Sequence, residues 1–126
     1  MNTIQQYILV AEDDIFLASA YRIKLTKVGY EVQIARDGAE VFTYLENKIP
    51  DLILLDLIMP LKNGFDVLTE LKKNIKWSNV PIIIASNLGQ KDDIDKGMSL
   101  GATDYVVKSD ISLEQLVEKI QTILKN

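Results

Sequence analysis

Short apolar runs and stretches with helical periodicity alternate along the whole chain. Five runs have the length and composition of strands, near Tyr7–Ala11, Glu31–Ala35, Asp51–Asp56, Pro81–Ala85 and Thr103–Val107. Five helical stretches follow them, near Ile15–Val28, Gly38–Asn47, Phe65–Asn74, Gln90–Leu100 and Leu113–Lys125. This alternation predicts an α/β fold, a doubly wound parallel sheet with helices on both faces.

Strand composition predicts the order of the sheet. The first, third and fourth strands are apolar on both sides, as central strands of a parallel sheet are. The second strand alternates polar and apolar residues over Glu31–Ile34, which is typical of an edge. With right-handed crossovers these features favour a flavodoxin-like (βα)5 fold of strand order 2-1-3-4-5. The ligand crevice then lies between the first and third strands.

Residues at the helix ends agree with this division. Gly29 follows the first helix, where a C-cap glycine is expected. Asp37 with Glu40, and Ser112 with Gln115, have the spacing of a capping box at helix starts. At 126 residues, with no linker or repeat, we expect residues 1–126 to form one domain.

Two apolar strands lead directly into carboxylates. Glu12, Asp13 and Asp14 follow the first strand, and Asp56 ends the third. If the two strands are parallel neighbours, these acids converge at one edge of the sheet and repel one another unless a cation is present. Oxygen ligands of this kind suit Mg²⁺. For Asp14, a metal role and an N-cap role for the first helix are equally open.

Composition removes several classes of function. The chain contains no histidine and no cysteine, which excludes Ser-His-Asp and Cys-His catalysis, the usual zinc sites and disulfides. A net charge of −4 argues against binding of nucleic acid or an anionic membrane surface. Apolar runs are far too short to span a bilayer. We therefore expect a cytoplasmic protein.

Two other strand ends carry reactive groups. The fourth strand leads into Ser86, and the fifth contains Tyr105 and leads into Lys108. Acyl-phosphate chemistry on a carboxylate needs a nucleophilic aspartate, cations that neutralise the phosphoryl oxygens, and a hydroxyl able to bond one of those oxygens. The predicted edge of the sheet offers all of these groups.

Over essentially its whole length the chain resembles the receiver domain of bacterial two-component response regulators. Each matching segment alone is weak, and the specificity comes from their order and spacing. The segments are Leu9–Asp14, Leu54–Pro60, Asn63-Gly64, Ala85-Ser86 and Gly101–Lys108. The resemblance implies a phospho-accepting signalling switch and not an enzyme that turns over a substrate.

The resemblance also implies a role for each site residue. Asp56 would accept the phosphoryl group. Mg²⁺ would be bound by Asp56, by Asp13 directly, by Glu12 through a water and by the backbone carbonyl of Ile58. The donor would be a histidine kinase or phosphotransfer protein, because this chain has no histidine of its own.

Three further roles concern the response to phosphorylation. Ser86 would be the switch hydroxyl, and Lys108 would bind the phosphoryl oxygens. Tyr105 would change its rotamer with the state of the switch, although a tyrosine that only packs at the rim of the site is an equally good explanation of this residue. The face formed by the fourth helix, fifth strand and fifth helix would then bind an unknown downstream protein. Gly97 and a thin apolar face suit the fourth helix to movement.

Departures from the commonest receiver pattern occur at three positions. Asn87 replaces a small apolar residue, Ser109 replaces a proline, and the acidic pair is Glu12-Asp13 instead of two aspartates. Because position 109 is not proline, we expect a trans Lys108–Ser109 peptide.

Other functions are less well supported by the residues. A haloacid-dehalogenase-type phosphatase needs a second aspartate at the position of Ile58. A flavin or nucleotide binder of the same sheet order needs a phosphate-binding loop where this chain has acids. A degenerate receiver would not need the intact set of acids, lysine and hydroxyl. The chain ends after the fifth helix, so either a free-standing receiver or a fragment of a larger protein is compatible with it.

Overall fold

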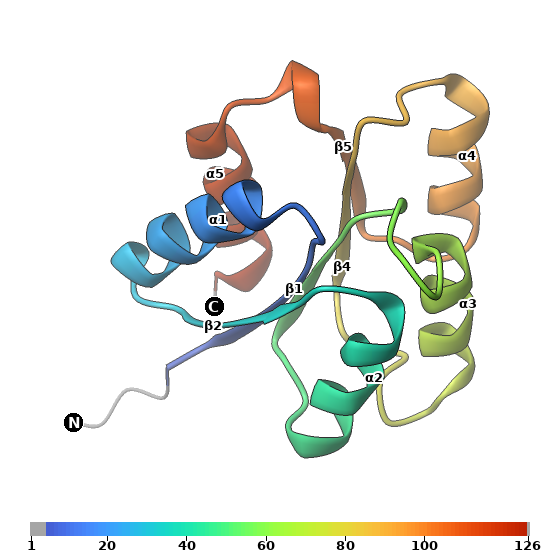
Figure 1. Cartoon of the computed structure of the whole chain (residues 1–126), viewed down its shortest axis with the longest axis horizontal. Helices are drawn as coiled ribbons and strands as arrows, with labels where there is room; N and C mark the ends of the chain where they lie inside the picture. Colours follow the sequence, from blue (N-terminus) through green and yellow to red (C-terminus); the bar gives the residue numbers. More distant parts are fainter. Residues whose placement is uncertain (1–4, 126) are drawn as a thin grey trace.

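The computed structural model describes residues 5–125, and its strands and helices alternate as the sequence predicts (Figure 1). The strands are β1 Tyr7–Ala11, β2 Glu31–Ala35, β3 Leu52–Leu55, β4 Ile82–Ser86 and β5 Asp104–Val107. The helices are α1 Ile15–Val28, α2 Gly38–Asn47, α3 Gly64–Lys73, α4 Lys91–Ser99 and α5 Leu113–Leu124. A short 3₁₀ helix at Lys108–Asp110, which the hydrophobic pattern of the sequence does not predict, follows β5.

All neighbouring strands are parallel, in the order β2-β1-β3-β4-β5. The predicted fold class and strand order are therefore confirmed. The three central strands are buried throughout, while β2 is only partly buried. Their apolar composition follows from this, because helices cover both faces of a doubly wound sheet.

Two apolar layers hold the helices to the sheet. One contains Leu9, Ile53 and Ile84 of the sheet together with residues of α2 and α3, and α4 lies on the same side (Figure 1). The other contains Ile8, Leu54 and further sheet residues with α1 and α5. Alternate residues of each strand enter opposite layers, because successive strand side chains point to opposite faces.

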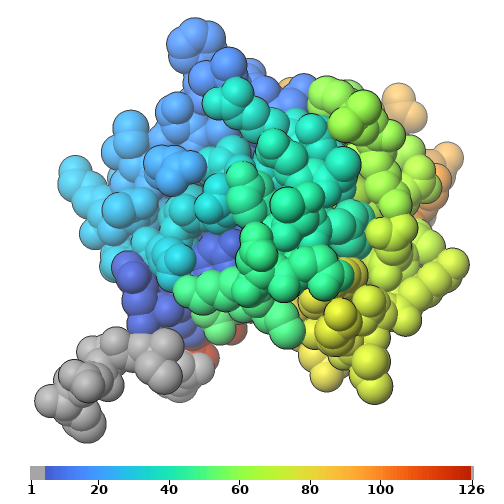
Figure 2. Space-filling view, turned by 60° about the horizontal axis from the view of Figure 1, so that its bottom comes forward, coloured from blue at the N-terminus to red at the C-terminus, as the bar shows by residue number. Residues whose placement is uncertain are grey.

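Polar side chains cap the exposed edge at β2. This strand lies between α1 and α2 on the side shown in Figure 2. The Arg22 guanidinium donates to the Val32 carbonyl at 3.4 Å, and the Gln33 amide donates to the Ile34 carbonyl at 3.4 Å. Such contacts cover carbonyl groups that could otherwise pair with another chain.

The predicted caps are present, with one change. Gly29 adopts a left-handed conformation (φ 118°) after α1, and Ser112 forms a complete capping box with Gln115. Asp37 caps α2 by accepting from the Glu40 amide at 2.8 Å. The Glu40 carboxylate, however, accepts from the Arg36 amide at 2.7 Å. The capping box predicted at α2 is therefore only partly correct. The Asp37 side chain accepts from the Glu40 amide as expected, but the Glu40 side chain bonds the amide of Arg36, the residue before the cap, instead of the Asp37 amide.

Helix α3 begins at Gly64, one residue earlier than predicted, because Asn63 caps it and accepts from the Asp66 amide at 3.0 Å.

Across residues 5–125, no helix has the length and apolar character needed to cross a membrane.

Candidate functional site

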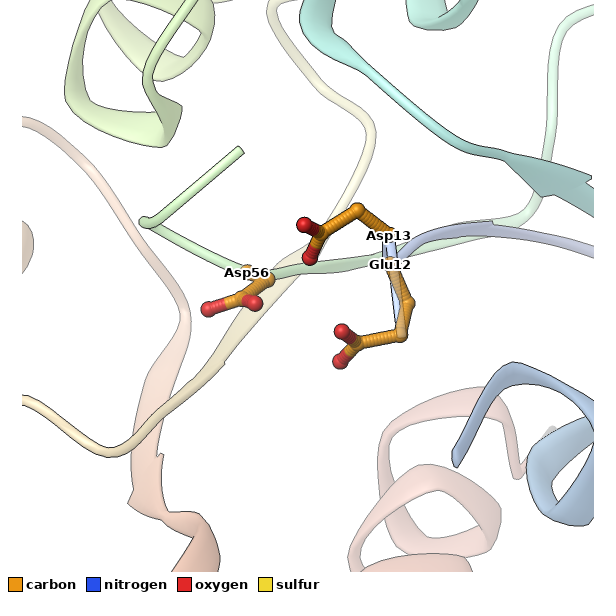
Figure 3. A group of neighbouring side chains, drawn as sticks. All are labelled: Glu12, Asp13 and Asp56. Atoms are coloured by element: carbon orange, nitrogen blue, oxygen red, sulfur yellow. The ribbon is translucent and has the colours of Figure 1, made fainter. Parts of the chain in front are cut away.

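Three carboxylates meet where β1 and β3 end. Ala11 of β1 lies beside Leu55 of β3, so the next residues of the two strands, Glu12 and Asp56, leave the sheet together. With Asp13 they bring one oxygen each within 4.8 Å of one another. Figure 3 shows the carboxylate groups of Glu12, Asp13 and Asp56 close to one another. The predicted convergence of these acids is present in the structure.

Lys108 joins the two buried acids of this group. Glu12 is 2% exposed and Asp56 is 6% exposed, whereas Asp13 is exposed. The Lys108 ammonium donates to Glu12 Oε1 at 2.6 Å and to Asp56 Oδ2 at 3.0 Å. A buried charge is tolerated when it is paired and hydrogen-bonded, and this lysine pairs with both. Lys108 is thus part of the acidic site and not a surface lysine.

The protonation of this pair reflects two opposing effects. Burial raises the pKa of Glu12, although hydrogen bonds from Lys108 and from the Asp14 amide oppose the change. Burial alone would lower the pKa of Lys108, but its hydrogen bond to Glu12 and the charge of Asp56 outweigh that effect and raise it. The ammonium form is therefore strongly favoured, and it neutralises only part of the negative charge around it.

The donor set fits a hard divalent cation. Mg²⁺ binds oxygens at about 2.1 Å, so two oxygens on opposite sides of the ion lie about 4.2 Å apart. The 4.8 Å limit that encloses the three carboxylate oxygens is compatible with that geometry after small side-chain adjustments. Because Asp13 is exposed, the remaining positions around an ion could be filled by water. These residues could therefore hold Mg²⁺.

Asp14 has a different role from its neighbours. Its Oδ1 accepts from the amides of Phe16 and Leu17 at 2.9 and 3.0 Å, which caps α1. Of the two roles left open by the sequence, the structure thus shows the N-cap.

Of the predicted switch residues, Ser86 is the last residue of β4 and Tyr105 lies within β5. Ser86 is fully buried, and its Oγ accepts from the Leu88 amide at 3.2 Å. The Tyr105 hydroxyl donates to the Leu88 carbonyl. The amide of Ile58, on the loop after β3, donates to Asp56 Oδ1 at 3.4 Å. Ser86 and Tyr105 thus contact the same short segment, while Ile58 lies next to the acids.

The loop between β3 and α3 is tightly packed against the aspartate. A methyl group added at Gly64 would lie 2.3 Å from the Asp56 carbonyl oxygen and 2.7 Å from Leu57 Cα. Both are backbone atoms, which cannot rotate away as a side chain can. In the same loop Leu61 adopts a left-handed conformation (φ 68°), which is unfavourable for a residue with a Cβ.

We expect Gly64→Ala to destabilise the protein by about 1–3 kcal/mol, the usual cost of overpacking. It should also displace Asp56, because the new methyl group meets the Asp56 backbone. Urea unfolding measures the first effect, and amide shifts of residues 55–58 measure the second. Gly89→Ala is the control, since its methyl group would lie 3.2 and 3.4 Å from Val107 side-chain atoms and 3.9 Å from the nearest backbone atom, the Asn87 carbonyl oxygen. Equal effects of the two substitutions would contradict this interpretation.

The chain after β5 forms a turn of 3₁₀ helix that begins at Lys108. No peptide bond in the described part of the chain is cis, so the Lys108–Ser109 peptide is trans as predicted. With the Lys108–Ser109 peptide in the trans form, the Lys108 ammonium still donates a hydrogen bond to Asp56.

Sequence reasoning missed one residue close to the site. Tyr21 of α1 is buried and lines, together with Lys108, a cavity of about 100 Å³ between α1 and α5. Burial, and then the charges of Glu12 and Asp56, raise its pKa. The spacing of Ala18, Tyr21 and Leu25 on one face of α1 was the available signal, and it identifies core residues without showing that Tyr21 lies near the acids.

Comparison with known proteins gives a consistent result. The family model described as "Response regulator receiver domain" matches residues 8–121. A probable transcriptional regulator, ycf27, of Cyanophora paradoxa is 38% identical over 125 residues, which are 99% of this chain and 51% of that protein. The DNA-binding response regulator MtrA of Mycolicibacterium smegmatis is 35% identical over 99% of this chain and 53% of its own length. The chain thus spans about half the length of these curated relatives.

Solved structures show the same similarity. The chemotaxis response regulator CheY4 of Vibrio cholerae has a TM-score of 0.88 at 26% identity, covering 96% of this chain and 100% of that chain. The phosphorylated cyanobacterial phytochrome response regulator RcpA has a TM-score of 0.83 at 32% identity, covering 95% and 91%. With its sheet order, its acidic group and a family match over most of its length, this chain belongs to the family of response regulator receiver domains.

Proposed function

We propose that this chain is the phospho-accepting switch of a two-component or phosphorelay system, and that residues 1–126 act as one receiver domain. Receiver domains are regulatory phospho-acceptors in two-component signalling. The observation that carries the proposal is Asp56, which ends a buried strand beside two other carboxylates and 3.0 Å from the Lys108 ammonium. This arrangement supports nucleophilic use of its carboxylate.

In the proposed reaction an Asp56 carboxylate oxygen attacks phosphorus, an O–P bond forms and the P–N bond of a donor phosphohistidine breaks. The donor is a histidine kinase or phosphotransfer protein, because the chain has no histidine. Bound Mg²⁺ would neutralise charge on the phosphoryl oxygens. Asp13, Asp56, Glu12 and the Ile58 carbonyl would hold it. Lys108 would supply a second positive charge to the same oxygens.

The proposed response starts at Ser86 and passes to α4 and β5. Ser86 would bond a phosphoryl oxygen, which changes its present contact with the Leu88 amide. Tyr105 bonds the Leu88 carbonyl, so a change in that segment reaches the tyrosine. A Cβ at Gly97 would lie 2.6 Å from Ile84 Cδ1 and 3.1 Å from the Tyr105 ring. Helix α4 is therefore close enough to respond when Tyr105 moves.

The proposal is tested by incubating the protein with acetyl phosphate in the presence and absence of Mg²⁺. We expect the intact mass to increase by one phosphoryl group only when Mg²⁺ is present. A phosphohistidine-bearing phosphotransfer protein should give the same product. Absence of any mass increase with both donors, or equal uptake after chelation of Mg²⁺, would contradict the proposal.

Mg²⁺ should also stabilise the unphosphorylated protein, because it binds the folded acidic site and relieves repulsion there. At a hundredfold excess over Kd the gain in unfolding free energy is about 2.7 kcal/mol. Thermal unfolding with increasing Mg²⁺ should show this gain in the wild type and much less of it in Asp13→Ala.

Asp14→Ala is the matched control for this measurement. Asp14 caps α1, so its loss should lower stability by about 1 kcal/mol without Mg²⁺. It should nevertheless retain the full increase on adding Mg²⁺. Equal Mg²⁺ responses of wild type and Asp13→Ala would reject the metal site.

A further inference from the structure

A groove of about 680 Å³ lies between β5 and α5. Side chains of Tyr105, Val107, Ile111 and Ile123 give it a partly apolar lining, and each of them is only partly buried. Its charged lining residues are three carboxylates and one ammonium, namely Asp104, Asp110, Glu118 and Lys119. The groove therefore combines apolar surface with an excess of negative charge.

The single ammonium of the groove is already paired. Lys119 donates to Asp104 Oδ2 at 3.0 Å. Asp110 and Glu118 are exposed, and neither forms an ion pair with any residue in the range 5–125. Two carboxylates of the groove are thus available to a partner.

The adjoining helix α4 adds further negative charge. Its Lys91 pairs with Asp95 at 2.7 Å. The Lys96 ammonium lies 4.3 Å from the centre of the Phe65 ring on α3. Asp92 and Asp93 have no ion pair within the part of the chain that the structure describes. The surface next to the groove is therefore acidic as well.

We propose that this groove binds a basic segment of a partner protein, in which apolar side chains contact the lining while Lys or Arg side chains pair with Asp110 and Glu118. The inference rests on the proposed function, for which it names the chemistry of the downstream partner. Complementary charge raises the rate of encounter and excludes partners of the same sign. The long stems of Lys and Arg can also cover apolar surface beside a carboxylate.

The same charges disfavour a second copy of this chain as the occupant. A second copy that docked through the same groove would bring three carboxylates and one ammonium, that of Lys119, which already pairs with Asp104. Like charges that approach closely at an interface repel one another unless a cation separates them. A basic partner avoids this cost.

Tyr105 connects the groove to the proposed phosphorylation site. It lines the groove, and its hydroxyl donates to the carbonyl of Leu88, whose amide donates to Ser86 Oγ. A rearrangement at Ser86 therefore changes the lining that the partner contacts.

The test uses three synthetic peptides of equal length with the same leucine positions and lysine, glutamine or glutamate between them. Titration into the isotope-labelled protein, with and without beryllium fluoride, should shift the amides of Val107, Ile111 and Ile123 with the lysine peptide only. Asp110→Asn with Glu118→Gln should weaken that binding about tenfold, as expected for the loss of two rim ion pairs. Lys119→Gln should strengthen it, because it frees Asp104.

The control is Glu46→Gln with Glu70→Gln, which removes the same number of charges from exposed ion pairs on α2 and α3. It should bind the lysine peptide as tightly as the wild type does. Equal binding of all three peptides, equal weakening in the control, or concentration-dependent dimerisation through these same residues would overturn the proposal.

Because the resting protein is titrated as well, the result does not depend on phosphorylation. Failure of Asp56 to accept a phosphoryl group would appear separately in the intact mass.

Discussion

Asp56→Asn is expected to abolish phosphorylation by acetyl phosphate and Mg²⁺. An uncharged amide is a poor nucleophile toward phosphorus, and it cannot contribute a negative oxygen to the metal site. The fold should survive, because Asn has nearly the same shape and Lys108 keeps its 2.6 Å contact with Glu12. Intact mass measures the uptake, and circular dichroism measures the fold.

Asp66→Asn is the control for this substitution. Asp66 lies in the first turn of α3, near the site in sequence but outside the group of converging carboxylates. The Asp66→Asn variant should therefore take up one phosphoryl group, at Asp56, as the wild type does. A mass increase that persists in Asp56→Asn would show that another residue is the acceptor, and the assignment of Asp56 would then be wrong.

The double substitution Ile58→Asn with Leu88→Glu is expected to shorten the life of the phosphorylated protein. Hydrolysis of an acyl phosphate requires a water held in line with phosphorus. The side chains two residues after Asp56 and two residues after Ser86 are best placed to hold it, and both are apolar here. Ile58 is 61% exposed, and Leu88 is partly buried and packs against the apolar layer that contains Ile53 and Ile84. Both side chains can therefore crowd the approach of water to the site.

We expect the polar pair to accelerate loss of the phosphoryl group at least about tenfold, which corresponds to a barrier lower by ~1.4 kcal/mol. The measurement follows phosphoprotein by intact mass after the donor is removed. Ile75→Asn, which changes a 90% exposed isoleucine after α3, is the control and should decay as the wild type does. An unchanged lifetime in the double variant would mean that these side chains do not set it.

A slow wild-type decay would have a functional consequence. A long-lived acyl phosphate suits sustained signalling or transfer to a further phosphotransfer protein, whereas a short-lived one suits rapid termination. The apolar residues at positions 58 and 88 favour the first alternative.

The local pattern of the sequence determined the fold and the convergence of the acids. Apolar runs identified the strands, and their composition separated central strands from the edge, because a central parallel strand is buried on both faces. Together with right-handed crossovers, this composition favoured the order 2-1-3-4-5, which the structure confirms. Since parallel strands end at the same edge, Glu12, Asp13 and Asp56 had to meet there.

The exact use of each side chain depended on contacts between distant elements. Asp14 caps α1, whereas its neighbour Asp13 belongs to the acidic group. The backbone conformation between β1 and α1 determines which aspartate has which role, and the order of the two residues in the sequence does not show it. Glu40 accepts from Arg36 and not from the predicted cap residue. The periodicity of α1 predicts that Tyr21 is a core residue. Its position in the same cavity as Lys108 depends on how α1 and α5 pack, which the sequence pattern does not show.

Charge balance was likewise decided by the tertiary structure. The sequence supplies a net charge of −4 but does not say which acids are neutralised. Folding pairs Lys108 with Glu12 and Asp56, and Lys119 with Asp104, leaving Asp110 and Glu118 open beside the groove. Lys108 and Glu12 lie 96 positions apart in the chain. Ion pairing depends on distances of a few ångströms, and for residues so far apart in sequence those distances are set by the packing of the helices on the sheet.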